Sequence, residues 1–264
     1  MAANPASATS SRAAREDAIR SIPLDKLDPA VRGKVATAIA ETSLFRRLPV
    51  QVIDCDPDLY LFLIRHPEVI VNIWEVMKIS NVALERTGSD TFRASDGAGT
   101  LCDVKYCYGD HETQVIYVEG AYSGPLLTRP VRAKCVLLLK SGYVRETNGR
   151  YFVTSRMDTF IQIEHAGLEL LAKTLAPLLH RSADYNFVET AAFVGTVSRT
   201  AEMNASGMYR LAGKLTNLQP DVRDRFAELS LEVGSKARGR EASKASAIGP
   251  IPKSAPTRVS MDRR

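Results

Sequence analysis

The chain has 264 residues, of which 45% are apolar, so it can build one or two domains with a substantial core. Eight of its 35 basic residues but only two of its 30 acidic residues lie in residues 235–264, so the net charge of +5 belongs to the C-terminal tail. The rest of the chain is close to neutral, which disfavours a broad nucleic-acid-binding face, because phosphate contacts need clustered Lys and Arg.

The sequence contains no stretch that is typical of a membrane span or of a secretion signal. No run of about 18 apolar residues occurs, and the start of the chain lacks the apolar core of a signal peptide. We therefore expect a cytoplasmic protein, or an exported one if a leader is missing from this sequence. The four cysteines form no CxxC pair and the four histidines have no paired spacing, so we expect reduced thiols, no metal and no cofactor.

The N-terminal part is expected to hold a disordered segment followed by a helical arm. Residues 1–20 are rich in Ala, Ser and Arg, a composition that favours disorder. In the arm, residues 21–47, the pair Asp28-Pro29 predicts a helix start, with Asp as the N-cap and Pro at the first helical position. The helix would bury the apolar stripe of Val31, Val35, Ala38 and Ile39.

A strand and two short helices are expected next. Residues 48–54 have the pattern of a strand, and Asp56-Pro57 predicts the start of a helix that ends near His66. Pro67 then begins a second helix. Both helices are apolar on most sides, so the pair should close one end of a core.

From Asn81 onward the apolar residues alternate, which indicates strands. In the strand at 131–140 the odd residues should face the core and the even residues, which include Arg132 and Lys140, should face solvent. Asn148-Gly149 is a strong hairpin signal. No helix interrupts the series, so we expect one antiparallel sheet rather than βαβ units. The expected strands are 83–86, 91–94, 102–108, 113–122, 131–140, 143–146 and 151–163.

The last third of the chain is predicted to be helical up to a terminal tail. One helix over 164–200 would be about 55 Å long, and Pro177 would remove a hydrogen bond inside it, so we expect a kink or a break between Pro177 and Asp184. Two further helices are expected in 201–234, at 206–215 and 220–233. Residues 235–264 should form a disordered basic tail, whose charge allows weak contact with anionic surfaces.

The order of strand, helix pair, antiparallel strands and long helix over residues 48–200 resembles the helix-grip, or START-like (SRPBCC), superfamily. That group includes polyketide cyclases, plant hormone receptors and lipid-transfer domains. The segment 52–63, followed by His66-Pro67-Glu68 and Trp74, is similar to its first strand, small–Pro turn and helix pair. The resemblance implies an α+β fold in which a curved antiparallel sheet grips a long C-terminal helix. The N-terminal and C-terminal helices of this chain would be additions to that form.

The space between such a sheet and its helix would be either a ligand cavity or a filled core. Ser155 and Thr159, on inward strand positions, would orient an oxygen of a ligand or bond to the protein itself. The residues expected to bind a ligand are Val104, Tyr106, Ile116, Val118, Cys135, Leu137, Val153, Ser155, Met157, Thr159, Leu171 and Leu175.

Three functions fit these expectations. The first is binding of a small apolar molecule, such as a lipid or a polyketide-like ring. The second is a cyclase- or hydrolase-type enzyme on the same scaffold, which requires Arg156, Asp158 or His165 to point inward. We expect Arg156 and Asp158 to form a surface pair instead. The third is a structural or interaction protein with a filled core and with its terminal helices as docking surfaces. The sequence leaves the catalytic residues unknown and contains no G-x-S-x-G nucleophile motif.

Overall fold

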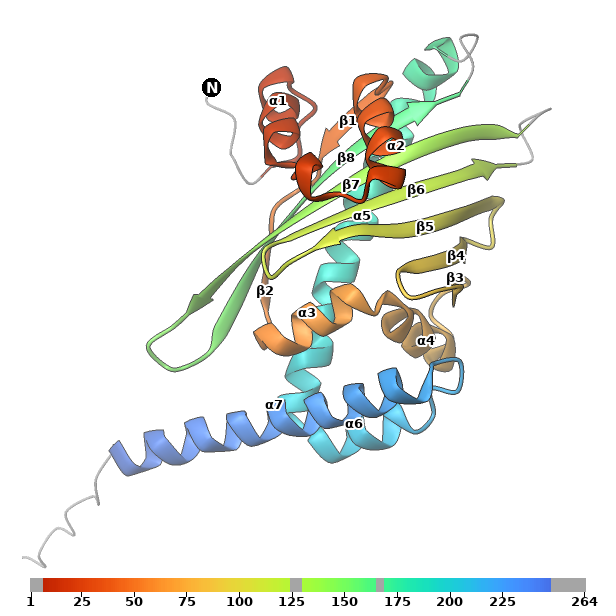
Figure 1. The fold of residues 1–264 in the computed structure, drawn as a ribbon. Helices are drawn as coiled ribbons and strands as arrows, with labels where there is room; N and C mark the ends of the chain where they lie inside the picture. Colours follow the sequence, from red (N-terminus) through yellow and green to blue (C-terminus); the bar gives the residue numbers. More distant parts are fainter. Residues whose placement is uncertain (1–6, 124–129, 165–168, 248–264) are drawn as a thin grey trace, which may run out of the picture.

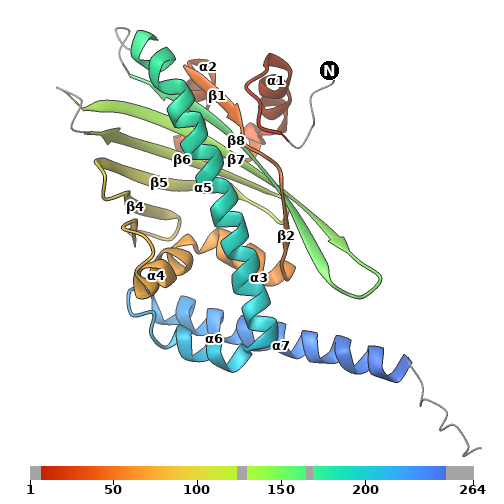
Figure 2. The ribbon, with the colours of Figure 1, turned by 180° about the vertical axis from the view of Figure 1, so that it is seen from behind.

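The computed structural model describes residues 7–123, 130–164 and 169–247, and in 169–179 and 244–247 it describes the backbone alone. A curved antiparallel sheet of eight strands has helices on both of its faces (Figures 1 and 2). The helices are α1 (Arg12–Ser21), α2 (Pro29–Ala40), α3 (Pro57–Arg65), α4 (Pro67–Met77), α5 (Glu169–Met203), α6 (Ala205–Ala212) and α7 (Pro220–Ala247). The strands are β1 (Leu44–Arg47), β2 (Gln51–Asp54), β3 (Ala83–Arg86), β4 (Thr91–Ser95), β5 (Thr100–Gly109), β6 (Thr113–Tyr122), β7 (Val131–Arg145) and β8 (Tyr151–Ile163).

The strands lie in the order β1-β8-β7-β6-β5-β4-β3, and β2 continues the edge made by β1, pairing with β8 as well. Each strand from β3 to β8 pairs with its neighbour in the chain, so the sheet is a meander closed on one edge by β1 and β2. The predicted hairpin at Asn148-Gly149 connects β7 and β8, with Gly149 at a φ of 80° that favours glycine. The α+β class and the uninterrupted antiparallel sheet are therefore confirmed.

The pairing register divides the sheet into two faces. On the inner face, Val104, Val118, Cys135 and Ile161 lie side by side across β5, β6, β7 and β8. Helix α5 lies on this side of the sheet (Figure 2). The outer face carries the alternate residues, and α1 and α2 cover the part of it formed by β1, β8, β7 and β6 (Figure 1). Each face therefore has its own layer of helices.

The covered part of the outer face is a closed core, which corrects the prediction for the apolar even residues of β7, whereas Arg132 is exposed as predicted. Val136 and Leu138 are 0% exposed, and so is Phe160 of β8. Against them pack Val35 and other residues of the stripe predicted for α2. In the sequence, the apolar residues Val136 and Leu138 at even positions of β7 already indicated that helices pack on this face.

The N-terminal segment is more ordered than its composition predicts. Residues 12–21, expected to be mostly disordered, form α1, which Ser11 caps by accepting a hydrogen bond from the amide of Ala14. Ala14 and Ala18 are buried against the outer face. Small side chains allow this close approach, so an alanine-rich stretch that is neutral by itself becomes a packed helix.

The helix pair α3–α4 begins at Pro57 and Pro67 as predicted, and it closes the lower end of a second core. Asp56 caps α3 through hydrogen bonds from the amides of Asp58 and Leu59, at 3.1 and 3.3 Å. This core joins α3, α4, α6 and α7 to the C-terminal half of α5 and to the ends of β2 and β8. It holds fully buried residues such as Tyr60 and Phe226.

The long helix α5 runs from Glu169 to Met203 as one continuous helix, so of the predicted kink or break the break does not occur. One missing hydrogen bond at Pro177 does not end a helix whose later turns are fixed by tertiary packing. Val194, Val197 and Ala201 supply that packing and are almost fully buried.

The C-terminal helix is also longer than predicted. Helix α7 continues to Ala247 through the first part of the segment expected to be a disordered tail. Lys236 binds Asp56 at 2.9 Å and Asp58 at 2.8 Å, and Arg240 pairs with Glu202. Lys236 and Arg240 therefore attach α7 to the rest of the chain through ion pairs. Residues 248–264 lie outside the described part of the chain.

Candidate functional site

The strand residues expected to line a ligand site lie on the inner face, by the register of the sheet. Val104 pairs with Val118, Val118 with Cys135, and Cys135 with Ile161. The next row joins Tyr106, Ile116, Leu137 and Thr159, and Val153, Ser155 and Met157 follow along β8 on the same face. Leu171 and Leu175 belong to α5, in the stretch whose side chains lie outside the description.

The inner face is packed at one end and partly exposed at the other. Towards the core of α3 and α5, Val153 is 0% exposed and Leu139 is 2% exposed. Towards the other end of the strands, Val104, Val118, Cys135, Leu137 and Ile161 all stay partly exposed. The apolar surface at that end is therefore covered only in part, although a long helix lies on the same side of the sheet.

Small residues form one row of this partly exposed end. Ala94, Cys102, Gly120 and Ala133 lie side by side across four strands. A Cβ atom on Gly120 would overlap the Cβ of Cys102 and the carbonyl oxygen of Leu101, so the curvature of the sheet requires glycine there. Because these four side chains are small, they leave more space above the inner face than the larger residues of the neighbouring rows.

The two polar residues expected to orient a ligand already have partners within the protein. Tyr60 donates to Ser155 Oγ at 3.2 Å, and the Thr159 hydroxyl donates to the carbonyl of Arg46 at 3.0 Å. Both side chains are buried, at 2% and 6% exposed. These hydrogen bonds give both hydroxyls a partner within the protein.

A polar group that the sequence interpretation missed lies at the β1 edge of the inner face. Arg46 forms an ion pair with Asp184 of α5. One turn away on α5, His180 has a buried Nε2 without a hydrogen-bond partner. Burial and the positive charge of Arg46 lower the pKa of His180 below its usual value. The negative charge of Asp184 acts in the opposite direction but does not outweigh them. The i, i+4 spacing of His180 and Asp184 was the available sequence signal.

The inner-face cysteines are not activated nucleophiles. Cys135 is partly exposed as a residue, but the protein atoms around its thiol desolvate it and raise its pKa to about 12; desolvation also raises the pKa of Cys102. Thiols in such surroundings stay protonated and inert at neutral pH. All four cysteines are free, as expected.

Arg156 and Asp158 lie on the face opposite the inner one and form an ion pair, as predicted, but the pair is not at the surface. Asp158 is 0% exposed on the outer face beneath α1. Arg47 Nε lies 2.6 Å from its Oδ1, and Arg156 Nε lies 3.5 Å from its Oδ2. Asp17 of α1 joins the cluster at 2.8 Å from Arg47, and the hydrogen bond from Arg47 lowers the pKa of Asp17. His165, the third candidate, lies outside the described residues.

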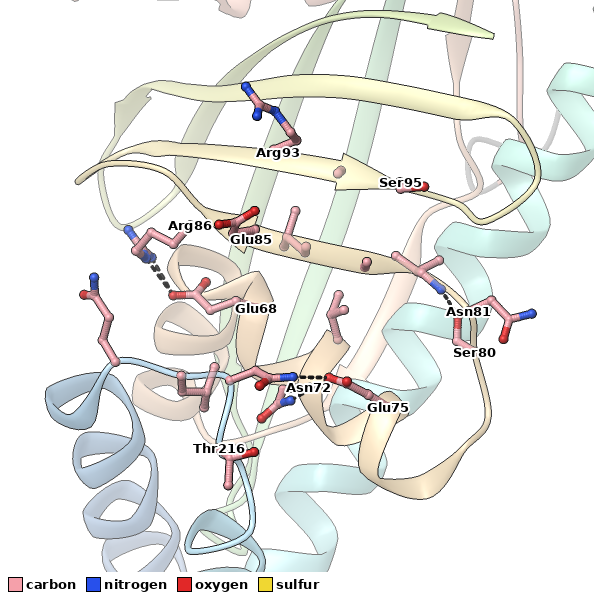
Figure 3. A pocket seen from close by; sticks show the side chains of 18 of the residues that line it. Glu68, Asn72, Glu75, Ser80, Asn81, Glu85, Arg86, Arg93, Ser95 and Thr216 are labelled. Carbon is pink, nitrogen blue, oxygen red and sulfur yellow. Dashed lines mark hydrogen bonds and ion pairs between the residues drawn. The ribbon is translucent and has the colours of Figure 1, made fainter. Parts of the chain in front are cut away.

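A separate polar cleft of about 970 Å³ lies between α4, the β3–β4 edge and the loop that joins α6 to α7. Figure 3 shows Glu68, Asn72 and Glu75 projecting from α4 towards this space, opposite Glu85 and Arg86 of β3. Arg86 binds Glu68 Oε1 through Nη2 at 2.7 Å and through Nε at 2.9 Å. Burial opposes ionisation of Glu68, but the bonds from His66 and Arg86 outweigh it and lower the pKa.

Two kinds of site are not found in the part of the chain that the structure describes. No cluster of three or more His, Cys, Asp or Glu side chains there has the arrangement needed to hold a metal ion. No helix in the same residues has the length and apolar character required to cross a membrane.

No protein-family model matches the chain, and no curated protein matches it. The function must therefore be inferred from the geometry of the inner face and of the polar cleft.

Proposed function

We propose that this protein is a helix-grip, START-like domain that binds a small apolar molecule against the inner face of its sheet, beside α5. The observation that carries the proposal is the partial exposure of Val104, Val118, Cys135 and Leu137 on one side of a curved sheet. Apolar patches that a monomer leaves open are typical of binding surfaces. Covering them contributes about 25 cal/mol per Å² before the cost of association.

The shape of the inner face supports a ligand at its partly exposed end. The row of Ala94, Cys102, Gly120 and Ala133 leaves room above the sheet, whereas Leu139 and Val153 fill the opposite end. Since Ser155 and Thr159 are satisfied internally, we assign the polar contact to His180, whose Nε2 has no partner. The ligand would then be mainly apolar with one hydrogen-bonding group.

Binding is favoured over catalysis by the position of the charged candidates. A cyclase or hydrolase would need at least one of three charged candidates inside, and two of them, Arg156 and Asp158, belong to the ion cluster under α1. Docking of another protein through the terminal helices is also less favoured. The apolar faces of α1, α2, α6 and α7 are already buried within this chain.

The proposal is tested by titration with a neutral apolar fluorophore, N-phenyl-1-naphthylamine. Ala133→Phe would fill the small-residue row and should weaken binding by about tenfold or more, because the apolar area offered to the probe is lost. Ala121→Phe adds the same ring on the outer face of the neighbouring strand and should leave the affinity within about twofold.

Native mass spectrometry of protein purified from cells gives an independent reading, and a retained apolar molecule of constant mass is the expected result. Absence of fluorophore binding by the unchanged protein would contradict the proposal. Equal losses of affinity in the two phenylalanine variants would contradict it as well.

A further inference from the structure

The polar cleft beside α4 has a binding character that differs from that of the inner face. Glu68, Asn72 and Glu75 recur along one face of α4 at the spacing i, i+4 and i+7, so all three present oxygens to the same side. Asn217, from the loop between α6 and α7, closes the lower edge by donating to Glu75 Oε2 at 2.7 Å.

Two acceptors in this cleft have no donor in the described part of the chain. Glu68 and Asn72 are only 5% and 4% exposed, and both line the cleft. Both hydrogen bonds from Arg86 to Glu68 end on Oε1, which leaves Glu68 Oε2 unpartnered. Asn72 Nδ2 donates to Glu75, which leaves the carbonyl oxygen Oδ1 of Asn72 without a partner. This oxygen can only accept a hydrogen bond. A buried acceptor without a partner is costly, and a bound donor relieves that cost.

The charges in the cleft favour a cationic donor. Among the described residues, neither Glu75 nor Glu85 has an ion-pair partner. The Glu75 carboxylate accepts hydrogen bonds from the side-chain amides of Asn72 and Asn217. The two arginines of the cleft are already paired, Arg86 with Glu68 and Arg93 with Asp103. Arg86 is further fixed over the ring of Phe92, at 4.4 Å from its centroid. The cleft therefore offers acceptors and negative charge without a free cation of its own.

We infer that this cleft binds a small organic amine through its protonated nitrogen. A primary ammonium has three N–H donors. Glu68 and Glu75 lie about two helical turns apart, so one ammonium of a diamine would donate to Glu68 Oε2 and the other to Asn72 Oδ1 and the Glu75 carboxylate. The volume of about 970 Å³ accommodates a diamine or polyamine chain. A divalent metal fits less well, because hard cations such as Ca²⁺ need six to eight oxygen ligands, and the described residues hold no metal-binding cluster.

The test is calorimetric titration of the full chain with 1,5-diaminopentane, with 1,5-pentanediol as the neutral probe of the same length and with calcium chloride as the metal probe. The diamine should bind and should shift the amide NMR signals of the segments around Glu75 and Asn217. Glu75→Gln keeps an acceptor for both asparagine amides but removes the charge, and it should weaken diamine binding by about tenfold.

The matched control is Glu112→Gln, an exposed glutamate outside the cleft, which should change the affinity by less than about twofold. Since Glu68→Gln can unfold the chain by freeing Arg86, it is used only if its thermal unfolding stays cooperative. Equal binding of the diol and the diamine would overturn the inference in favour of a hydroxyl-binding site. Tighter binding of calcium, or no binding of the diamine, would also overturn it.

Discussion

The two faces of the sheet differ in how completely helices cover them. On the outer face α1 and α2 bury Val136, Leu138 and Phe160, next to an ion cluster in which Asp158 is 0% exposed. The inner face is packed at Leu139 and Val153, but Val104 and Leu137 stay partly exposed although α5 lies on the same side. The buried charge of Asp158 is tolerated because Arg47 and Arg156 pair with it, and the partly exposed apolar positions are the ones that the proposed ligand would cover.

The largest expected effect comes from breaking the ion cluster of the closed face. Arg47→Met removes the main partner of the buried Asp158 carboxylate and should cost about 3–5 kcal/mol of unfolding free energy, measured by denaturant titration. The double variant Arg47→Met/Asp158→Leu removes both charges and should recover most of that loss. If the single variant is as stable as the unchanged protein, the outer face does not depend on this cluster.

Alanine substitutions at three consecutive leucines of β7 test whether the covered and the partly exposed regions differ in packing along one strand. Leu138 on the outer face is 0% exposed and Leu139 at the packed end of the inner face is 2% exposed, so each change to alanine should cost about 2–5 kcal/mol. Leu137→Ala, at a partly exposed inner position, should cost about 1 kcal/mol. Equal losses at all three positions in thermal unfolding would show that the inner face is as closed as the outer one.

The smallest effect concerns the acid dependence of the outer face. The hydrogen bond from Arg47 lowers the pKa of Asp17 in the folded state, so the folded protein binds fewer protons there than the unfolded chain. The stability from Asp17 is thus complete above its unfolded pKa, near 3.9, and is lost as the pH falls through the lower folded pKa.

Asp17→Asn should therefore destabilise the protein slightly at pH 7, by less than about 1 kcal/mol because the side chain is partly exposed. The difference between the two proteins should shrink on acidification below about pH 4. A difference that stays constant down to pH 2 would contradict an ionic role for Asp17.

Local chemistry made several elements predictable. Asp28-Pro29 and Asp56-Pro57 both begin helices, since an Asp side chain can accept from the first free amides and Pro lacks the amide that would be unpaired. The Asn148-Gly149 turn is where the sequence predicts it. Alternation also grouped Val104 and Cys135 on one face, because the strand period of two is fixed by the backbone.

Contacts between distant segments were not predictable from such rules. The burial of Asp158 depends on α1, more than 130 residues earlier in the chain, whose alanine-rich sequence gives no sign of a packed helix by itself. The polar face of α4 becomes the wall of a cleft only because β3 and the Asn217 loop pack opposite it. Likewise, Pro177 alone predicts a kink or a break in α5, and the packing of Val194 and Val197 keeps the helix continuous.

The sequence by itself determined most of the strands and helices from α2 onward, the antiparallel character of the sheet and the set of residues that share its inner face. These properties follow from backbone periodicity, capping and turn chemistry, which act over a few neighbouring residues. Only the tertiary structure decided which face is sealed, which charges are buried and where unpartnered acceptors line a cleft. Those outcomes depend on which distant surfaces meet, because burial and pairing are properties of both partners together.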